Sequence, residues 1–346
     1  MTDLLREVDE MPLSLLDTPA SRLNDILGGP TLFHLTGRRE PALFVSVLMH
    51  GNETSGWDSI RQVLRGFRNG EGLDLPRSLS LFVGNTAAAK VGVRHLPDQP
   101  DYNRVWPGSE TSGTPEHDLM RQVVDTMAGR EIFASVDVHN NTGLNPHYAC
   151  VNVLEHQSLH LAALFGRIVV YFVRPRGVAS MAMAALGPSV TLECGKVGQP
   201  RGVEHAAEYL DACLHLAEIP SHRVATHDID LYHTVAIVRV PPQHEFSFGD
   251  DEAEINFSRN LDTMNFRELP VGSLFAECNG ALHQPLDVRD EQDHAVAERY
   301  FRVDDGRLVT RVPVMPSMLT CNPEVIRQDC LCYLMERYND HLADAG

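Results

Sequence analysis

The stretch ALFVSVLMHGNE, residues 42–53, contains the pattern that decides the fold. Its first eight residues form an apolar run of the kind found in a central strand that is covered on both faces. A turn containing His50 and Glu53 follows, and residues 54–67 have the pattern of a helix. A strand that leads through a short turn into a helix is the repeating unit of α/β folds, so we expect such a domain here.

The same alternation continues on the C-terminal side of this stretch. It predicts an α/β domain with a central mixed sheet flanked by helices. Residues 84–114 show neither a strand nor a helix pattern, and irregular stretches of that length are usually functional. The expected strands are 79–83, 132–138, 148–153, 168–173 and 190–192, and the expected helices are 115–127, 157–165 and 203–217.

The character of the sequence changes near Ile219-Pro220-Ser221. Beyond this point come short alternating runs, such as 235–240 and 273–277, separated by Gly, Pro, Asn and Asp. This pattern is typical of β-rich structure. The sequence therefore predicts two domains: an α/β domain over residues 1–220 and a smaller β-rich domain over residues 221–346.

Composition limits the classes of partner. The chain has 29 Lys and Arg residues against 47 Asp and Glu residues, a net charge of −18, which repels nucleic acid and anionic membranes. No apolar run approaches the roughly 20 residues of a membrane span, and residues 1–11 lack the pattern of a secretory signal. Seven scattered cysteines indicate reduced thiols. We expect a cytoplasmic protein without nucleic-acid or membrane partners, and the sequence leaves a homo-oligomer open.

Two of the predicted strand ends carry side chains that metals bind. His50 and Glu53 lie three residues apart at one strand end, and His139 follows the strand at 132–138. Two histidines and one glutamate form a catalytic zinc set in which the fourth position is left for water. Asp137 lies on the same side of its strand as His139 and is suited to orient a ligand. Each residue alone also fits a structural role, so the prediction rests on their combination at strand ends.

Glu193 lies at the end of another predicted strand. A buried glutamate is costly unless it has a partner or a task, and a buried ion pair is the structural alternative. Beside a metal-bound water, this carboxylate would act as general base and then protonate the leaving amine.

The irregular stretch at 84–114 supplies the arginines that an acidic protein needs if it binds an anion. Arg104 offers a planar fork for a carboxylate, and Asn103 can donate beside it. Arg94 is suited to polarise a carbonyl and stabilise an oxyanion. Asp101 is suited to hold one arginine in place. A solvated surface loop is the alternative interpretation.

Taken together, these residues resemble the succinylglutamate desuccinylase and aspartoacylase family of the zinc carboxypeptidase superfamily. The resemblance covers residues 41–217 and extends more loosely into the β-rich part. It implies one zinc ion per chain held by His50, Glu53 and His139. It further implies that Glu193 activates the water, that Arg94 polarises the carbonyl, and that Asn103 and Arg104 hold the substrate carboxylate. The matching segments are His50-Gly51-Asn52-Glu53, Gly84-Asn85, Arg94, Asp101-Tyr102-Asn103-Arg104, Asp137-Val138-His139 and Leu192-Glu193-Cys194-Gly195.

The implied substrate is a small anionic N-acyl amino acid, with N-succinylglutamate first. Lys196 and residues 261–266 resemble the desuccinylase branch, whereas residues 140–147 fit neither branch. Three alternatives stay open: deacylation of N-acetylaspartate or a related compound, carboxypeptidase action on short peptides, and a non-catalytic module that binds carboxylates. A degenerate relative of the last kind would lose a ligand or the general base, and here all are present.

Overall fold

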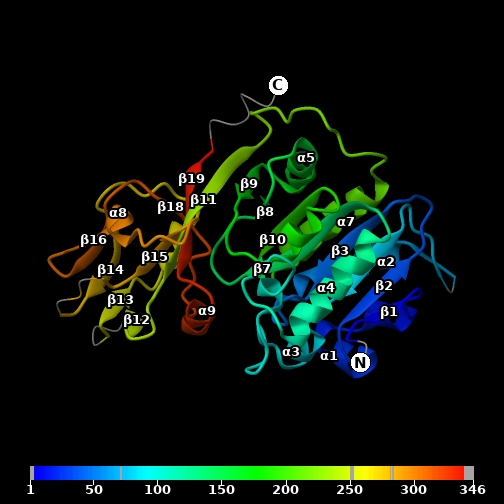
Figure 1. Cartoon of the computed structure of the whole chain (residues 1–346), viewed down its shortest axis with the longest axis horizontal. Coiled ribbons are helices and arrows are strands. Elements are labelled where there is room, and N and C mark those ends of the chain that lie inside the picture. Colours follow the sequence, from blue (N-terminus) through cyan, green and yellow to red (C-terminus); the bar gives the residue numbers. More distant parts are fainter. Residues whose placement is uncertain (1–3, 71, 250–252, 281, 283, 339–346) are drawn as a thin grey trace. The chain divides into compact units, whose positions relative to one another are not determined.

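The computed structural model describes residues 4–70, 72–249, 253–280, 282 and 284–338, and their contacts form two compact units (Figure 1). The first unit comprises residues 1–140, 147–171 and 175–230. The second comprises residues 141–146, 172–174 and 231–346. Each unit is a group of residues that contact one another, and neither is shown to fold alone. The domain boundary expected at residue 220 therefore stays a prediction.

A mixed sheet forms the centre of the first unit, as the sequence predicted. Its strands follow the order β1-β2-β6-β3-β7-β10-β8-β9. The strand β3 pairs in parallel with both β6 and β7, while β2 runs antiparallel to β6. The strand bounds are β1 Arg6–Val8, β2 Thr31–Leu35, β3 Ala42–Val47, β6 Leu79–Val83, β7 Ile132–Asn141, β8 Tyr148–Val151, β9 Ile168–Tyr171 and β10 Ser189–Lys196, with a separate small hairpin of β4 Arg68–Asn69 and β5 Gly72–Leu73.

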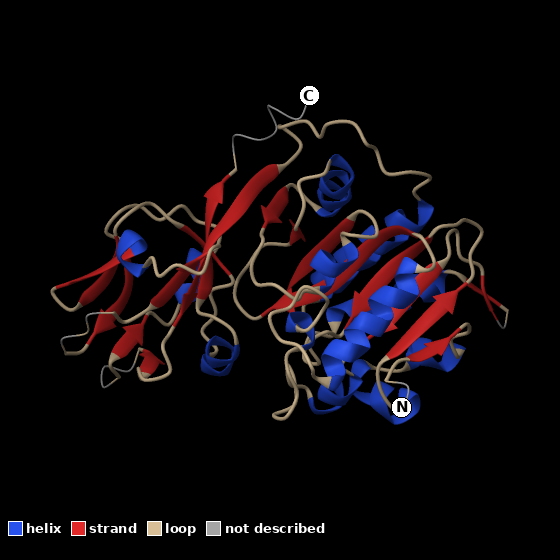
Figure 2. Cartoon of the chain, viewed as in Figure 1, coloured by secondary structure: helices blue, strands red, loops and turns tan. Residues whose placement is uncertain are grey.

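Helices cover both faces of this sheet (Figure 2). Phe44 of β3 belongs to the core cluster that contains the buried face of α4. Its neighbours in β3 point the other way, where Val47 lies against Gly56 of α2. This alternation explains why all six residues of β3 are buried. The helix bounds are α1 Ala20–Leu27, α2 Ser55–Gly66, α3 Thr86–Val91, α4 Pro115–Ala128, α5 His156–Phe165, α6 Ala179–Met183 and α7 Pro200–His215, with 3-10 turns η1 Leu13–Asp17 and η2 Tyr102–Arg104.

Local capping fixes where two of these helices begin. The side chain of Asn85 accepts a hydrogen bond from the Ala88 N–H at the start of α3. Thr114 caps α4 in the same manner, and Pro115 occupies the first turn of that helix. The expectation of an irregular segment over residues 84–114 was therefore partly wrong, because Asn85 starts a short helix inside it.

The second unit is β-rich, as expected. One of its sheets has the order β12-β13-β14-β17-β16, and β11 pairs with both β15 and β19, which pairs with β18. Its helices are short, and no helix of the described residues is long and apolar enough to cross a membrane. The bounds are β11 Asp230–Arg239, β12 Phe246–Phe248, β13 Ile255–Phe257, η3 Leu261–Met264, β14 Leu274–Cys278, β15 Asp287–Asp290, α8 Ala297–Tyr300, β16 Phe301–Asp304, β17 Arg307–Thr310, β18 Met315–Ser317, α9 Pro323–Gln328 and β19 Cys332–Arg337.

Candidate metal centre

The chain leaves β3 through a strained residue. Leu48 has φ of 59°, in the left-handed region that bulky side chains rarely occupy. It is fully buried, so the surrounding core holds this conformation in place. The turn that follows brings His50 to the carboxyl end of β3 and leads through Glu53 into α2. Strained backbone of this kind often lies beside functional side chains.

His50, Glu53 and His139 converge on one point. The Nδ1 atom of His50 lies 2.8 Å from Oε1 of Glu53, and the Nδ1 atom of His139 lies 2.9 Å from Oε2. All three residues are buried, and one ligand atom from each lies within 4.8 Å of the others. Each histidine therefore presents the same nitrogen to a different oxygen of one carboxylate, and the group could hold a metal ion.

Each histidine also contacts a second carboxylate through its other ring nitrogen. Asp101 Oδ1 lies 3.0 Å from Nε2 of His50, and Asp137 Oδ2 lies 2.7 Å from Nε2 of His139. Ser46 donates from its Oγ to the other oxygen of Asp137 at 2.6 Å. A metal-binding histidine usually donates its outer N–H to such a carboxylate, which fixes both ring orientation and tautomer.

Arg94 is held against the same cluster. Its Nε and one terminal nitrogen donate to Asp101 Oδ2 at 3.0 and 2.8 Å. Another terminal nitrogen lies 3.8 Å from Oε1 of Glu53. The Arg94 carbonyl also accepts a hydrogen bond from the Gly51 N–H at 3.0 Å, which ties the irregular stretch to the turn after β3. Asp101 thus contacts both an arginine and a histidine, where the sequence suggested only the arginine.

Asn103 lies inside the cluster. Its Oδ1 accepts a hydrogen bond from the Ala179 N–H at 2.9 Å, and its Nδ2 lies 3.2 Å from Nε2 of His139. Arg104 is only partly buried, and its guanidinium donates to the Asn103 carbonyl at 2.9 Å. The role of Asn103 and Arg104 in holding a substrate carboxylate stays a prediction.

We use the name metal centre for the seven residues His50, Glu53, Arg94, Asp101, Asn103, Asp137 and His139. Burial acts to raise the pKa of Glu53, but His50 and His139 outweigh it and lower that pKa below its usual range. Burial opposes the charge of Asp101 too, yet Arg94 and His50 hold its pKa well below the ordinary value. The pKa of His139 is raised well above its usual value, because Asp137 and Glu53 overcome the effect of burial.

The charge balance of the metal centre fits a divalent cation. Histidine binds a metal ion in its neutral form, and with both histidines neutral the metal centre has three carboxylates against one guanidinium, an excess of two negative charges for the ion to compensate. Uncompensated buried charge is strongly unfavourable. Two imidazoles and a carboxylate are also the donor set of catalytic zinc sites, so the residues present fit the ion that the resemblance implies.

Glu193 lies on β10, where it is paired in register with Tyr148 of β8. Only 9% of the residue is exposed. After burial itself, the nearby Glu193 carboxylate is the next cause that raises the pKa of Cys150 and of Cys194 well above the ordinary thiol value. Both thiols are therefore held in the protonated form around an acidic side chain.

Asn140, which sequence reasoning did not single out as a site residue, links the segments that carry these groups. Its backbone N–H donates to Oε2 of Glu53 at 3.0 Å. Its side-chain Oδ1 accepts from the Ser55 N–H at 3.2 Å, and its Nδ2 donates to the Gly195 carbonyl at 2.9 Å. One residue thus connects β7, the start of α2 and the end of β10, two residues beyond Glu193. In the sequence, the only indication of this role was that a polar residue directly follows His139.

The comparison with family models gives one match. The model described as the succinylglutamate desuccinylase/aspartoacylase catalytic domain matches residues 39–216, the segment that contains the whole metal centre and Glu193. A comparison with curated protein sequences finds no match.

Solved structures share the fold over most of the chain. The succinylglutamate desuccinylase from Chromobacterium violaceum is 19% identical, with a TM-score of 0.54, and the match covers 87% of this chain and 86% of that one. Murine aminoacylase 3 is 15% identical, with a TM-score of 0.55 and coverage of 87% and 97%. An ectoine utilization protein from Ruegeria pomeroyi is 15% identical, with a TM-score of 0.53 and coverage of 88% of each chain. At these identities the similarity shows the fold alone.

Proposed function

Because the chain belongs to the succinylglutamate desuccinylase/aspartoacylase family, whose members hydrolyse N-acyl amino acids, we propose that it cleaves the amide bond of a small N-acyl amino acid. N-succinylglutamate is the first substrate to test. The observation that carries the proposal is the buried group of His50, Glu53 and His139 within the family-matched segment.

In this proposal, one zinc ion per chain is held by His50, Glu53 and His139. When bound, zinc supplies Lewis acidity that polarises a carbonyl oxygen and makes water more acidic. The chain's part is to keep the three donors in place. Asp101 and Asp137 do so by accepting hydrogen bonds from the outer nitrogens of the two histidines.

Glu193 is assigned the proton transfers. Its carboxylate takes a proton from the attacking water and delivers that proton to the nitrogen of the leaving amine, so the amide C–N bond breaks and no net proton is gained by the enzyme. The burial of Glu193 supports this role, because burying a carboxylate is costly unless the group has a partner or a task.

Arg94 and Arg104 are assigned to the anionic parts of the reaction. Arg94 polarises the scissile carbonyl, and its hydrogen bonds to Asp101 fix the guanidinium beforehand, so little reorganisation is needed. Arg104, with Asn103 beside it, holds the amino acid carboxylate. In a chain with a net charge of −18, such local cations are needed to attract an anionic substrate.

The test is a hydrolysis screen with the zinc-loaded full chain. N-succinyl, N-acetyl and N-formyl derivatives of glutamate and aspartate would be supplied, and the free amine released would be measured. We expect release from at least one of them, and release that is slower by about 10² to 10⁴ with the Glu193→Gln variant. Preference for N-acetylaspartate would favour the aspartoacylase alternative, and release from unmodified short peptides alone would favour a carboxypeptidase. Wild-type protein that contains zinc and cleaves none of these compounds would contradict the proposal.

A further inference from the structure

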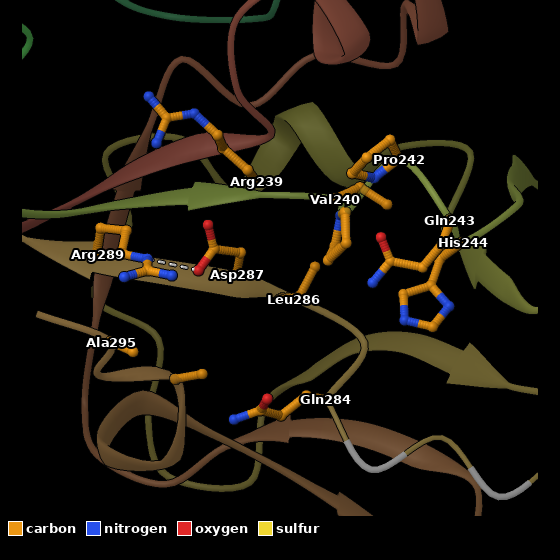
Figure 3. A pocket seen from close by; sticks show the side chains of 12 residues that line it. Arg239, Val240, Pro242, Gln243, His244, Gln284, Leu286, Asp287, Arg289 and Ala295 are labelled. Carbon is orange, nitrogen blue, oxygen red and sulfur yellow. Dashed lines mark hydrogen bonds and ion pairs between the residues drawn. The ribbon is translucent and has the colours of Figure 1, made fainter. Parts of the chain in front are cut away.

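The second unit contains a cavity of about 500 Å³ beside β11 and β15 (Figure 3). We call it the β11–β15 cavity and define its polar lining as Arg239, Gln243, His244, Gln284, Asp287 and Arg289. Its volume lies within the range of small-molecule sites, about 300–1,000 Å³. No residue of the metal centre lines it.

The strand register places two arginines and one carboxylate on one face. Arg239 lies directly opposite Asp287 in the antiparallel pairing of β11 with β15, and Arg289 follows two residues after Asp287. Directly opposed residues share a face of the sheet, and so do residues two apart on a strand. The cavity wall therefore carries two positive charges and one negative charge in an otherwise strongly acidic protein.

Only one of the two arginines is neutralised. Arg289 donates from its Nε to Asp287 Oδ1 at 2.8 Å. Arg239 donates from its Nε to the Asp329 carbonyl at 3.2 Å, and no carboxylate of the described residues forms an ion pair with it. The Asp287–Arg289 pair is 36–37% exposed, so it contributes little stability and a ligand can rearrange it at small cost.

The cavity is also lined by two side-chain amides and an imidazole with spare hydrogen-bonding capacity. Among the residues that the structure describes, the side-chain amides of Gln243 and Gln284 have no hydrogen-bond partner. His244 uses Nδ1 toward Glu254, 3.2 Å away, which leaves its Nε2. In Figure 3 the Gln243 amide extends toward the side of the cavity where Asp287 lies. The buried side chains of Val240 and Leu286 add an apolar surface.

We propose that the β11–β15 cavity binds a free α-amino acid as a zwitterion. The ammonium group pairs with Asp287, the carboxylate pairs with Arg239 and Arg289, and the Gln243 and Gln284 amides contact the side chain. A ligand with both charges matches a wall with both charges, whereas a simple dianion leaves Asp287 facing a like charge. An N-acyl amino acid lacks the ammonium group, so the cavity distinguishes a free amino acid from its acylated form.

This inference goes beyond the proposed hydrolysis, because it places a second ligand site in the second unit and requires no turnover. The test is isothermal titration calorimetry on the zinc-loaded full chain. The probes are L-glutamate, L-aspartate and L-alanine, with succinate and N-acetyl-L-glutamate as probes without an ammonium group. The titrations use an Arg104→Gln background, which removes the arginine proposed to hold the substrate carboxylate in the first unit, so that binding at the second site is measured by itself.

We expect at least one free amino acid to bind in that background. Asp287→Asn and Arg239→Gln should each weaken binding about ten- to a hundredfold, since each removes one charge-assisted hydrogen bond. Gln243→Ala removes an exposed side chain with no partner among the described residues, so it tests the cavity without disturbing the fold. It should weaken binding about threefold to tenfold. Arg302→Gln, which changes a half-exposed arginine of β16 outside the cavity, should bind like the parent.

Three results would overturn the inference. One is the absence of binding by all three amino acids in the Arg104→Gln background. Another is unchanged binding in both single variants, Asp287→Asn and Gln243→Ala. A third is equal binding of succinate and the amino acids, which would make the cavity a general anion site. Circular dichroism melting curves would show that each variant is folded.

Discussion

The metal centre of the first unit and the β11–β15 cavity of the second both gather charged side chains, and they differ in how those charges are satisfied. In the metal centre each histidine contacts two carboxylates, and Asp101 contacts both Arg94 and His50. In the cavity a partly exposed ion pair lies beside an arginine that has no carboxylate partner among the described residues.

Burial explains the difference. A charged group in the protein interior must be paired and hydrogen-bonded, because the cost of its desolvation is large. An exposed group is compensated by water, so it can stay unpaired until a ligand arrives. The side chains of the metal centre are therefore paired before any ligand binds, whereas the side chains of the β11–β15 cavity can still rearrange. Variants of the metal centre should have large effects that extend to metal binding and turnover.

The largest effect is expected for His50→Ala. It removes one of three buried donors, so zinc should fall from about one ion per chain to a small fraction, and hydrolysis should be lost with it. Inductively coupled plasma mass spectrometry after dialysis measures the metal. His227→Ala changes a histidine that is 84% exposed and should keep its zinc. Full zinc content in His50→Ala would remove the basis of the metal centre.

Glu193→Gln should separate metal binding from turnover. The variant keeps the three donors, so zinc content should match that of the wild type. Turnover should fall by about 10² to 10⁴, the usual contribution of a general acid–base group. Glu208→Gln alters an exposed glutamate on α7 and serves as the matched control. If Glu193→Gln turned over at the wild-type rate, the proton would have to move through another residue.

Asn140→Ala should have an intermediate effect. It removes the hydrogen bonds to Ser55 and Gly195 but keeps the backbone N–H that donates to Glu53. We expect a loss of about tenfold to a hundredfold in kcat or zinc affinity, as for other residues that orient metal ligands. Asn24→Ala is the control, because it removes a hydrogen bond that Thr86 donates to a side chain outside the metal centre. Equal behaviour of the two variants would show that Asn140 has no positioning role.

Gly202→Ala should have the smallest effect, and its effect is on stability. A Cβ atom at Gly202 of α7 would lie 2.2 Å from the carbonyl oxygen of Cys194, next to Glu193. Moving α7 away from β10 should cost about 1–3 kcal/mol in the free energy of unfolding, measured by urea denaturation. Gly66→Ala places the same methyl group in open space at the end of α2 and should be neutral or slightly stabilising. Equal stability of both variants would show that α7 is not tightly packed behind the site.

Sequence reasoning predicted the convergence of His50, Glu53 and His139 better than the contacts around them. Residues 42–53 predicted β3 and the turn after it, because a strand buried on both faces has a distinctive apolar run. That placement brought His50, Glu53 and His139 to neighbouring strand ends, and in the structure they converge. The sequence did not predict β1, β2 or α1. In the sheet, β2 pairs antiparallel with β6, and β6 lies between β2 and β3.

Features that depend on distant pairings were missed. The hydrogen bonds of Asn140 reach Ser55 and Gly195, 85 and 55 residues away along the chain. The cavity depends on the register that sets Arg239 opposite Asp287, and a shift by one residue would turn one of them to the other face. Local patterns predict elements and strand ends, whereas such contacts become visible only once the strands are paired.

The hydrogen bonds of Asn140 have a mechanical consequence. The first unit ends at Asn140 in this part of the chain, and residues 141–146 belong to the second unit. Where the chain passes from the first unit to residues 141–146, it is therefore held to the start of α2 and to the end of β10 by the side chain of Asn140, directly after His139. An engineer who wishes to vary residues 141–146 should leave Asn140 unchanged.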